Sequence, residues 1–228
     1  MTCCSAMQPL PLPGLERLIA ICQSFLLGVN VDPPARHPAE AGALVEGLPF
    51  DPVLAAVYAR LGDAALGTRL GGISILSADD ESDGRAESNR LWREQGQKEV
   101  ALPLFLFAAE PGTAYYYATV PSLADERRYQ PVVHVADYAL DDYMTLPIAS
   151  DVDRFFNTYA RYLEALVAHP AFPQEGEVAL TFPWDVPELI REDARLVSLI
   201  RAGRFDSVMK ADDSVRRWLD RVLAANDT

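Results

Sequence analysis

The sequence predicts an α+β fold, in which helices pack around a twisted, mainly antiparallel sheet and a helical extension follows at the C-terminus. Four apolar, partly aromatic runs follow one another through short connections over residues 102–148, which is typical of an antiparallel meander rather than of βαβ units. Apolar side chains then recur at helical spacing over residues 152–167. We expect a main domain at residues 1–173, including an N-terminal helix, with the helical extension at residues 174–228 docked on it.

The N-terminal region is expected to begin with a helix. The apolar run at residues 18–29 is too short to span a membrane and lacks the basic region of a signal peptide, so we interpret it as an ordinary helix. Pro13 opens this helix, Leu26 shares its apolar face and Gly28 closes it.

A second helix follows a proline-rich connector. A short helical segment is expected at residues 39–46. Asp51 is a good N-cap and Pro52 suits the first helical position, where a missing N–H costs nothing, so a helix is expected from Pro52 to about Leu61.

The middle of the chain supplies the sheet. The run at residues 102–107 is apolar on both faces and predicts a central strand. Further strands are expected at residues 73–76, 115–120, 131–136 and 143–148, the last being shorter, and a polar helix carrying Trp92 at residues 87–95. Ser150 predicts the N-cap of the long helix. In the extension, helices are expected at residues 185–202 and after Asp212 or Asp213.

Charge and cysteine content restrict the class of protein. The net charge of −13 and the pI near 4.6 argue against nucleic-acid binding and against an anionic membrane surface, but they permit a basic partner. Three cysteines near the N-terminus form neither a disulfide framework nor a metal-binding motif. A reducing cytoplasm fits best.

Signals for catalysis or cofactor binding are absent from the sequence. The three histidines lie far apart, and His134, within a strand, suits a structural residue with satisfied hydrogen bonds better than a base. No nucleophile elbow or phosphate-binding glycine motif is present. Residues 79–84 imitate the start of a calcium loop, but Arg90 stands where a carboxylate must chelate. We therefore expect no catalytic residues, no metal and no cofactor.

An acidic cluster with tyrosines is the candidate site. Residues 110–153 contain eight acidic and two basic side chains, a balance of 2 − 8 = −6. Aspartate also favours turns and helix N-termini for local reasons, so this excess has a purely structural interpretation. The functional interpretation is a surface for a basic protein partner, with tyrosine as an anchor. The candidate partner-binding residues are Asp137, Tyr138, Asp141, Asp142 and Tyr143.

The order of motifs over about residues 39–168 resembles the SMI1/KNR4 (SUKH) superfamily. The motifs are a Leu-Pro pair opening a helix, a Gly-containing turn, a hydrophobic strand and an aromatic strand separated by a glycine, and an Ala-Ser step into a helix with paired aromatics. They stand here at Leu48-Pro49, Gly62 or Gly71-Gly72, residues 104–107, Gly112, residues 115–117, Ala149-Ser150 and Phe155-Phe156. The family's usual asparagine after the Leu-Pro helix is missing, and the tail after Pro170 is not part of its core.

The resemblance implies an α+β domain without catalysis. Many bacterial members look like immunity proteins that bind and neutralise toxin domains, so our leading hypothesis is a non-catalytic, cytoplasmic protein of this type. A scaffold or regulatory module without a toxin partner is the first alternative, which a neighbouring toxin gene would distinguish. The second is an enzyme with a dispersed site, such as His134 with a nearby aspartate in a deep pocket. The partner and the oligomeric state are not predicted.

Overall fold

The computed structural model describes residues 10–34, 36–68, 72–79, 84–95, 100–137, 143–210 and 212–224. Over these residues the chain has the predicted α+β class and is built on one seven-stranded antiparallel sheet of order β1-β4-β5-β6-β7-β8-β9. Its strands are β1 (Gly28–Val31), β4 (Ala64–Gly67), β5 (Ile73–Ile75), β6 (Phe105–Ala109), β7 (Tyr115–Thr119), β8 (Val132–Asp137) and β9 (Tyr143–Ala149). A separate hairpin joins β2 (Leu44–Val45) to β3 (Leu48–Pro49).

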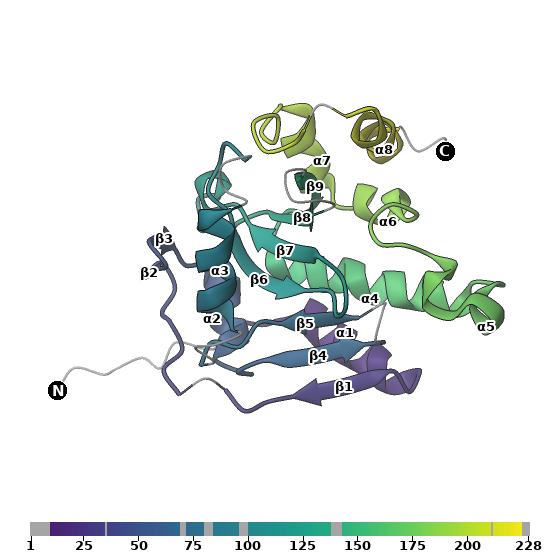
Figure 1. The fold of residues 1–228 in the computed structure, drawn as a ribbon, viewed down its shortest axis with the longest axis horizontal. Coiled ribbons are helices and arrows are strands. Elements are labelled where there is room, and N and C mark those ends of the chain that lie inside the picture. Colours follow the sequence, from purple (N-terminus) through teal and green to yellow (C-terminus); the bar gives the residue numbers. More distant parts are fainter. Residues whose placement is uncertain are drawn as a thin grey trace.

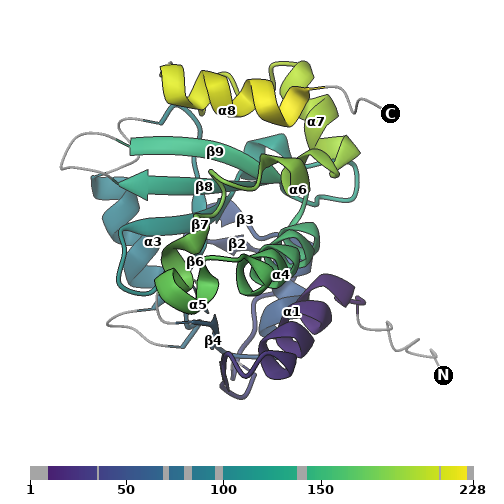
Figure 2. The ribbon, with the colours of Figure 1, turned by 90° about the vertical axis from the view of Figure 1, so that its right-hand side faces the viewer.

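Helices cover both faces of this sheet. The adjacent helices α1 (Pro13–Ser24) and α4 (Val152–Ala168) cover one face, and α3 (Arg85–Glu94) lies on the other (Figures 1 and 2). The other helical segments are α2 (Pro52–Tyr58), α5 (Phe172–Glu175), α6 (Pro187–Arg191), α7 (Ala194–Arg201), α8 (Asp213–Leu223) and the 3-10 turns η2 (Pro121–Leu123) and η3 (Gly176–Ala179). None of the described helices is long and apolar enough to cross a membrane.

The predicted central strand and long helix form the middle of the core. Phe107 of β6 packs edge-on against Phe155 and Phe156 of α4, with ring centroids 5.8 and 6.4 Å apart. All three side chains are fully buried. The N-cap of α4 is Asp151 rather than Ser150, and its carboxylate accepts a hydrogen bond from the Arg154 N–H.

Helices α1 and α4 approach each other closely at Gly14. A Cβ atom at Gly14 would collide with the carbonyl oxygen of Asp153, so only glycine fits. The N–H groups of Gly14 and Leu15 donate to the Asp153 carboxylate at 2.9 and 3.2 Å. Arg17 adds an ion pair with Glu164 at 2.8 Å. Helices α1 and α4 are therefore joined where both begin and again, through Arg17, in the second half of α4.

Two expectations about the N-terminal region are wrong. Residues 39–46 do not form a helix, because Glu46 and Gly47 both adopt positive φ values, 50° and 80°, and turn the chain into the β2–β3 hairpin. Helix α1 ends at Ser24, and Leu26 is 93 % exposed with a φ of 55° rather than part of the apolar face. The following residues pair with β4 as the edge strand β1.

The C-terminal region packs along the opposite edge of the sheet. Instead of one helix, residues 187–201 form α6 and α7, because the Asp193 carboxylate caps α7 by accepting from the Leu196 N–H at 3.0 Å. The same side chain accepts from the Ser150 N–H at 2.7 Å. Of the two caps that the sequence allows, Asp212 is the one that caps α8, and the indole N–H of Trp218 donates to the Pro183 carbonyl at 3.0 Å.

Candidate protein-binding surface

Helix α3 is fixed to the sheet by a buried asparagine. The Asn89 side chain donates to the carbonyl of Leu106 at 2.8 Å and accepts from the N–H of the same residue at 2.9 Å. It is 1 % exposed and also donates to the carbonyl of Arg85 at 2.9 Å. Asn89 thus satisfies both main-chain groups of a β6 residue as a neighbouring strand would.

The first residue of α3 is anchored in the core by its guanidinium group. The central carbon of that group in Arg85 lies 4.8 Å from the ring centroid of Tyr58 and 5.3 Å from that of Phe50. Such cation–π contacts stabilise a desolvated arginine. With Asn89, this side chain leaves α3 little freedom to shift on the sheet.

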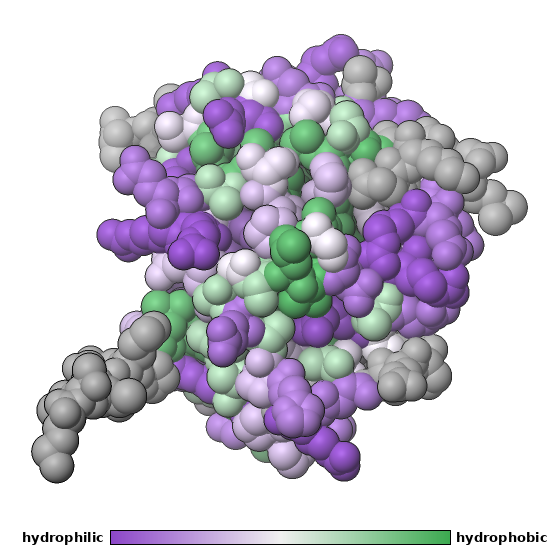
Figure 3. Space-filling view, turned by 90° about the vertical axis from the view of Figure 1, so that its left-hand side faces the viewer, coloured by the Kyte–Doolittle hydropathy of each residue, from purple (hydrophilic) through white to green (hydrophobic). Residues whose placement is uncertain are grey.

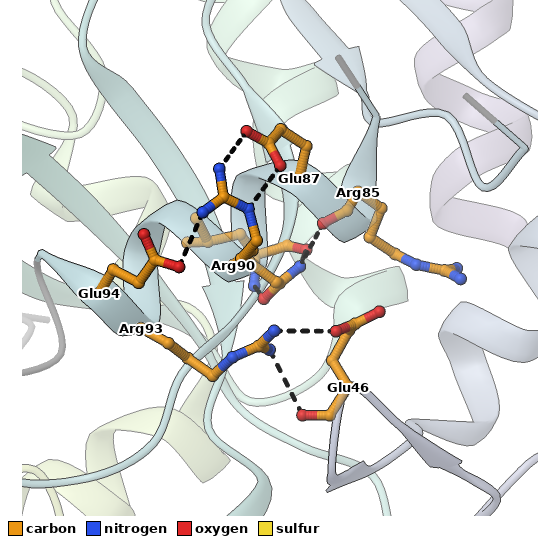
Figure 4. Close-up of polar contacts among 8 residues, drawn as sticks. Glu46, Arg85, Glu87, Arg90, Arg93 and Glu94 are labelled. Atoms are coloured by element: carbon orange, nitrogen blue, oxygen red, sulfur yellow. Dashed lines mark hydrogen bonds and ion pairs between the residues drawn. The ribbon is translucent and has the colours of Figure 1, made fainter. Parts of the chain in front are cut away.

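Ion pairs fix the charged side chains on the outer side of α3 (Figure 4). Arg90 pairs with Glu87 at 2.6 Å and with Glu94 at 2.7 Å, one turn away on either side. Arg93 pairs with Glu46 at 2.9 Å and so connects α3 to the β2–β3 hairpin. The charges on this helix are therefore largely neutralised locally.

A groove of about 180 Å³ runs beside α3 and contains the one predicted partner-binding side chain that the structure describes. Tyr143, the first residue of β9, is half-buried and meets Trp92 of α3 edge-on with ring centroids 5.0 Å apart. Tyr116 and Leu91 also line this groove. Aromatic side chains therefore surround a hollow at the end of the β8–β9 connection.

Beyond Tyr116 a second groove, of about 450 Å³, crosses the open face of β4 and β5. Tyr116 and Ser88 line both grooves, so the two hollows adjoin beside α3. Asn30 of the edge strand and Ser74 of β5 line the second groove. Its lining is more polar than that of the first.

Two exposed leucines extend this surface. Leu44 on the hairpin is 75 % exposed, and Leu91 on α3 is 39 % exposed. Figure 3 shows that hydrophobic side chains lie between hydrophilic ones on the side of the molecule that carries α3 and the hairpin. We name Leu44, Leu91, Trp92, Tyr116 and Tyr143 the α3 surface.

The other four predicted site residues are not seen in full. Tyr138, Asp141 and Asp142 lie outside the described residues, as does the side chain of Asp137, whose main chain ends β8. The ends of β8 and β9 are adjacent, because Asp137 pairs with Tyr143. That these five residues form a binding site is still a prediction.

Half of the acidic side chains counted over residues 110–153 have local structural roles. Asp151 caps α4 and Asp153 binds the start of α1, as described above. Asp125 pairs with Arg195 at 2.9 Å. The Glu110 carboxylate is buried, accepts a hydrogen bond from the Tyr117 hydroxyl, and burial raises its pKa to about 7. These four residues therefore do not belong to one acidic surface.

His134 of β8 is inaccessible to a substrate in this structure. Its side chain is 1 % exposed and its ring centroid lies 5.2 and 5.6 Å from those of Tyr115 and Tyr117. Within the described chain neither ring nitrogen has a hydrogen-bond partner, so the expectation of satisfied hydrogen bonds is wrong. Burial lowers the pKa of His134 to about 3, which keeps the ring neutral at pH 7.

The segment that resembles a calcium-binding loop, residues 79–84, shows no cluster of metal ligands in the part that the structure describes. Glu81 and Asp83 lie outside the described residues, and the Asp79 carboxylate accepts a hydrogen bond from the Arg36 N–H at 3.1 Å. No group of three or more potential ligands that could hold a metal ion occurs among the described residues.

Comparisons with known protein families, with curated proteins and with solved structures give no match.

Proposed function

We propose that this chain is a non-catalytic, cytoplasmic protein-binding domain of the immunity type, which binds and neutralises a basic toxin domain. One observation carries the proposal: Leu91 of a helix that is fixed on the sheet lines a groove together with the half-buried Tyr116 and Tyr143, and the buried Trp92 forms part of its wall. The resemblance of the sequence motifs to the SMI1/KNR4 superfamily supports it, and we propose the fold of that family for the domain.

The α3 surface has the composition of a protein interface. Aromatic anchors in partly formed pockets supply much of the binding energy in such interfaces, and apolar neighbours exclude water around them. Trp92, Tyr116 and Tyr143 line a hollow, with Leu91 beside it. Because Asn89 and the ion pairs already hold α3 in place, binding here costs little further ordering.

The charge of the chain favours a basic partner. The net charge of −13 creates a field that attracts cationic proteins and steers their encounter. In the sequence, Asp137, Asp141 and Asp142 belong to the segment that ends at Tyr143, which lines the groove. In this arrangement the acidic side chains accelerate association, and the α3 surface slows dissociation.

The first experiment identifies the partner. The purified chain, tagged at one end, is used to capture proteins from the organism that encodes it, and genes beside its own are tested for toxicity with and without co-expression. We expect a basic toxin domain whose toxicity the chain suppresses. Capture of a non-toxic signalling protein would instead support the scaffold alternative, and turnover of a small molecule by the purified chain would overturn the proposal.

The second experiment locates the contact with matched variants. Leu91→Arg places a cation on the α3 surface opposite a basic partner and should abolish suppression of toxicity. Val178→Arg is the control, because Val178 is another exposed hydrophobic side chain, 66 % exposed, in η3 away from α3. Equal suppression by both variants, with both folded, would place the contact elsewhere.

The third experiment tests the role of the acidic residues. Asparagine at positions 137, 141 and 142 removes three charges, so the association rate should fall and its dependence on salt should weaken. The control removes three charges from exposed positions in α1, α5 and α6: Glu16→Gln, Glu175→Gln and Glu188→Gln. An equal loss in both triple variants would mean that only the total charge matters.

A further inference from the structure

The outer edge of β1 is open. This strand is the last of the sheet at the end opposite to β9, and no described element pairs with its outer side (Figure 1). All four of its residues are exposed. Among the described residues seven large hydrophobic side chains are exposed, and four of them gather here: Phe25 (42 %), Leu26 (93 %), Val29 (37 %) and Val31 (40 %).

This edge lacks the usual protection against pairing. Natural edge strands carry lysines, prolines or bulges, or are covered by another element, because unpaired main-chain groups otherwise recruit a further strand. Within β1 there is no charged residue, no proline and no bulge, and prolines follow only at positions 33 and 34. The edge is therefore competent to accept another strand.

The alternating direction of the main-chain groups along β1 shows which of them point outward. The N–H of Asp32 donates to the carbonyl of Asp63 at 3.1 Å, on the β4 side. Because main-chain groups alternate in direction along an antiparallel strand, Gly28 and Asn30 also face β4, and Val29 and Val31 face outward. Two N–H and two carbonyl groups are thus available at the open edge.

We infer that β1 pairs antiparallel with β1 of a second copy of this chain, on a two-fold axis through Asn30. In this register Val29 of one copy lies opposite Val31 of the other, and these two outward-facing residues exchange both hydrogen bonds. Val31 of the first copy and Val29 of the second form the symmetry-related pair and do the same, which gives four main-chain hydrogen bonds in total. The two sheets then form one continuous sheet across the dimer.

The side chains fit this register. Val29 and Val31 lie on one face of the strand, so the two copies bring four valines together on that face, near the exposed Phe25 and Leu26. On the other face, Asn30 lies opposite itself and its amide can donate to and accept from its copy. Asp32 lies opposite Gly28, so no two carboxylates meet across the pair.

A second copy fits this edge better than a basic chain does. The strand contains no charge that would select a cationic segment, whereas its own sequence is complementary to itself in the antiparallel direction. Each copy carries a net charge of −13, so the two repel at low ionic strength. Dimerisation should therefore strengthen as added salt screens this repulsion.

The test is sedimentation equilibrium of the purified full chain over a wide concentration range at low and at high salt. We expect a reversible monomer–dimer equilibrium that shifts toward dimer at high salt. Val31→Pro removes an outward N–H without touching the ladder to β4, a position where edge strands tolerate proline. It eliminates two hydrogen bonds per dimer, so dimerisation should weaken by at least about tenfold.

Two further variants distinguish pairing through β1 from association through another exposed surface. Val29→Lys adds a positive charge that reduces overall repulsion, yet it should also weaken dimerisation, because lysine at this position protects an edge. Val178→Lys makes the same kind of change in η3, outside both β1 and the α3 surface, and should leave dimerisation unchanged. Circular dichroism and thermal melting confirm that each variant is folded.

Three results would overturn self-pairing. The first is a chain that stays monomeric at every concentration and salt. The second is a dimer that Val178→Lys disrupts while both β1 variants do not. The third is a monomer whose binding to a separate partner is lost in Val31→Pro, since the edge would then serve that partner. The first two results leave the proposed function untouched, whereas the third would move the partner contact from the α3 surface to the β1 edge.

Discussion

The two edge strands of the sheet, β9 and β1, differ in whether another part of the chain covers them. Along β9, α7 and the segment that contains Val208 cover the strand, and the Thr145 hydroxyl donates to the Val208 carbonyl. Along β1, four exposed residues face solvent. The two edges also differ in how they are built, because β9 is a seven-residue strand and β1 has four residues. The C-terminal extension therefore acts as a cover for one edge, and the chain has no equivalent for the other among its described residues.

The largest change in the free energy of unfolding is expected at the residue that holds α8 of the C-terminal extension in place. Trp218 of α8 is 2 % exposed, and its indole N–H donates to the Pro183 carbonyl. Trp218→Ala should lower the free energy of unfolding by about 3–5 kcal/mol, because it leaves a large cavity and an unsatisfied carbonyl.

Urea denaturation measures this change, and Arg217→Ala on the exposed side of the same helix is the control, which should stay within about 0.5 kcal/mol. Similar losses in the two variants would mean that α8 does not stabilise the covered edge.

A pH-dependent effect is expected within the covered half of the sheet. His134 stands in β8, next to β9, and burial lowers its pKa from 6.5 to about 3. A depressed histidine pKa means that the unfolded chain takes up a proton first. The stability contributed by the neutral ring is thus present above pH 6.5 and lost as the pH falls toward 3.

His134→Leu should remove this loss. The free energy of unfolding of the wild type should fall relative to the variant by up to about 1.4 kcal/mol per pH unit below pH 6.5. The comparison with the variant is needed because Glu110, whose pKa is raised to about 7, gains stability as the pH falls over part of the same range. Parallel pH profiles of the two proteins would contradict the burial of an unpaired ring.

The smallest changes in the free energy of unfolding should come from exchanging threonine and valine, which have nearly the same shape, in the two edge strands. Thr145→Val leaves the buried Val208 carbonyl without its donor and should lower the free energy of unfolding by about 1–3 kcal/mol. Val29→Thr at the open edge should change it by no more than about 0.5 kcal/mol in the monomer.

Thermal denaturation of both variants at a concentration below dimerisation measures the difference. A larger loss from Val29→Thr than from Thr145→Val would reverse the comparison between the edges.

The sequence predicts the covered edge better than the open one. Strands β6 to β9 follow from apolar runs, and helix α4 follows from the helical spacing of its apolar residues, which are local signals. Strand β4 consists of Ala64, Ala65, Leu66 and Gly67, residue types with low or ordinary strand propensity, so only its pairing with β1 and β5 reveals it. β1 is concealed because its valines continue an apolar helix in the sequence.

The candidate site was predictable in part for the same reason. Tyr143 and Trp92 stand out as aromatic residues near the ends of expected elements, and the structure brings them together. Asn89 and Arg85 gave no signal, because polar residues in a short polar helix normally face solvent. Their burial depends on β6 and α2, which only the assembled fold provides.

The contact of Gly14 with Asp153 has a consequence for how the chain is made. These residues are 139 positions apart, so the partner of α1 leaves the ribosome long after α1 itself. At about 5–20 residues per second, this delay is roughly 7–30 s. During that time the apolar face of α1, with Leu15, Leu18 and Cys22, has no α4 to cover it. The nascent N-terminal helix is therefore a natural client for chaperones, and the domain completes its core only after most of it has been translated.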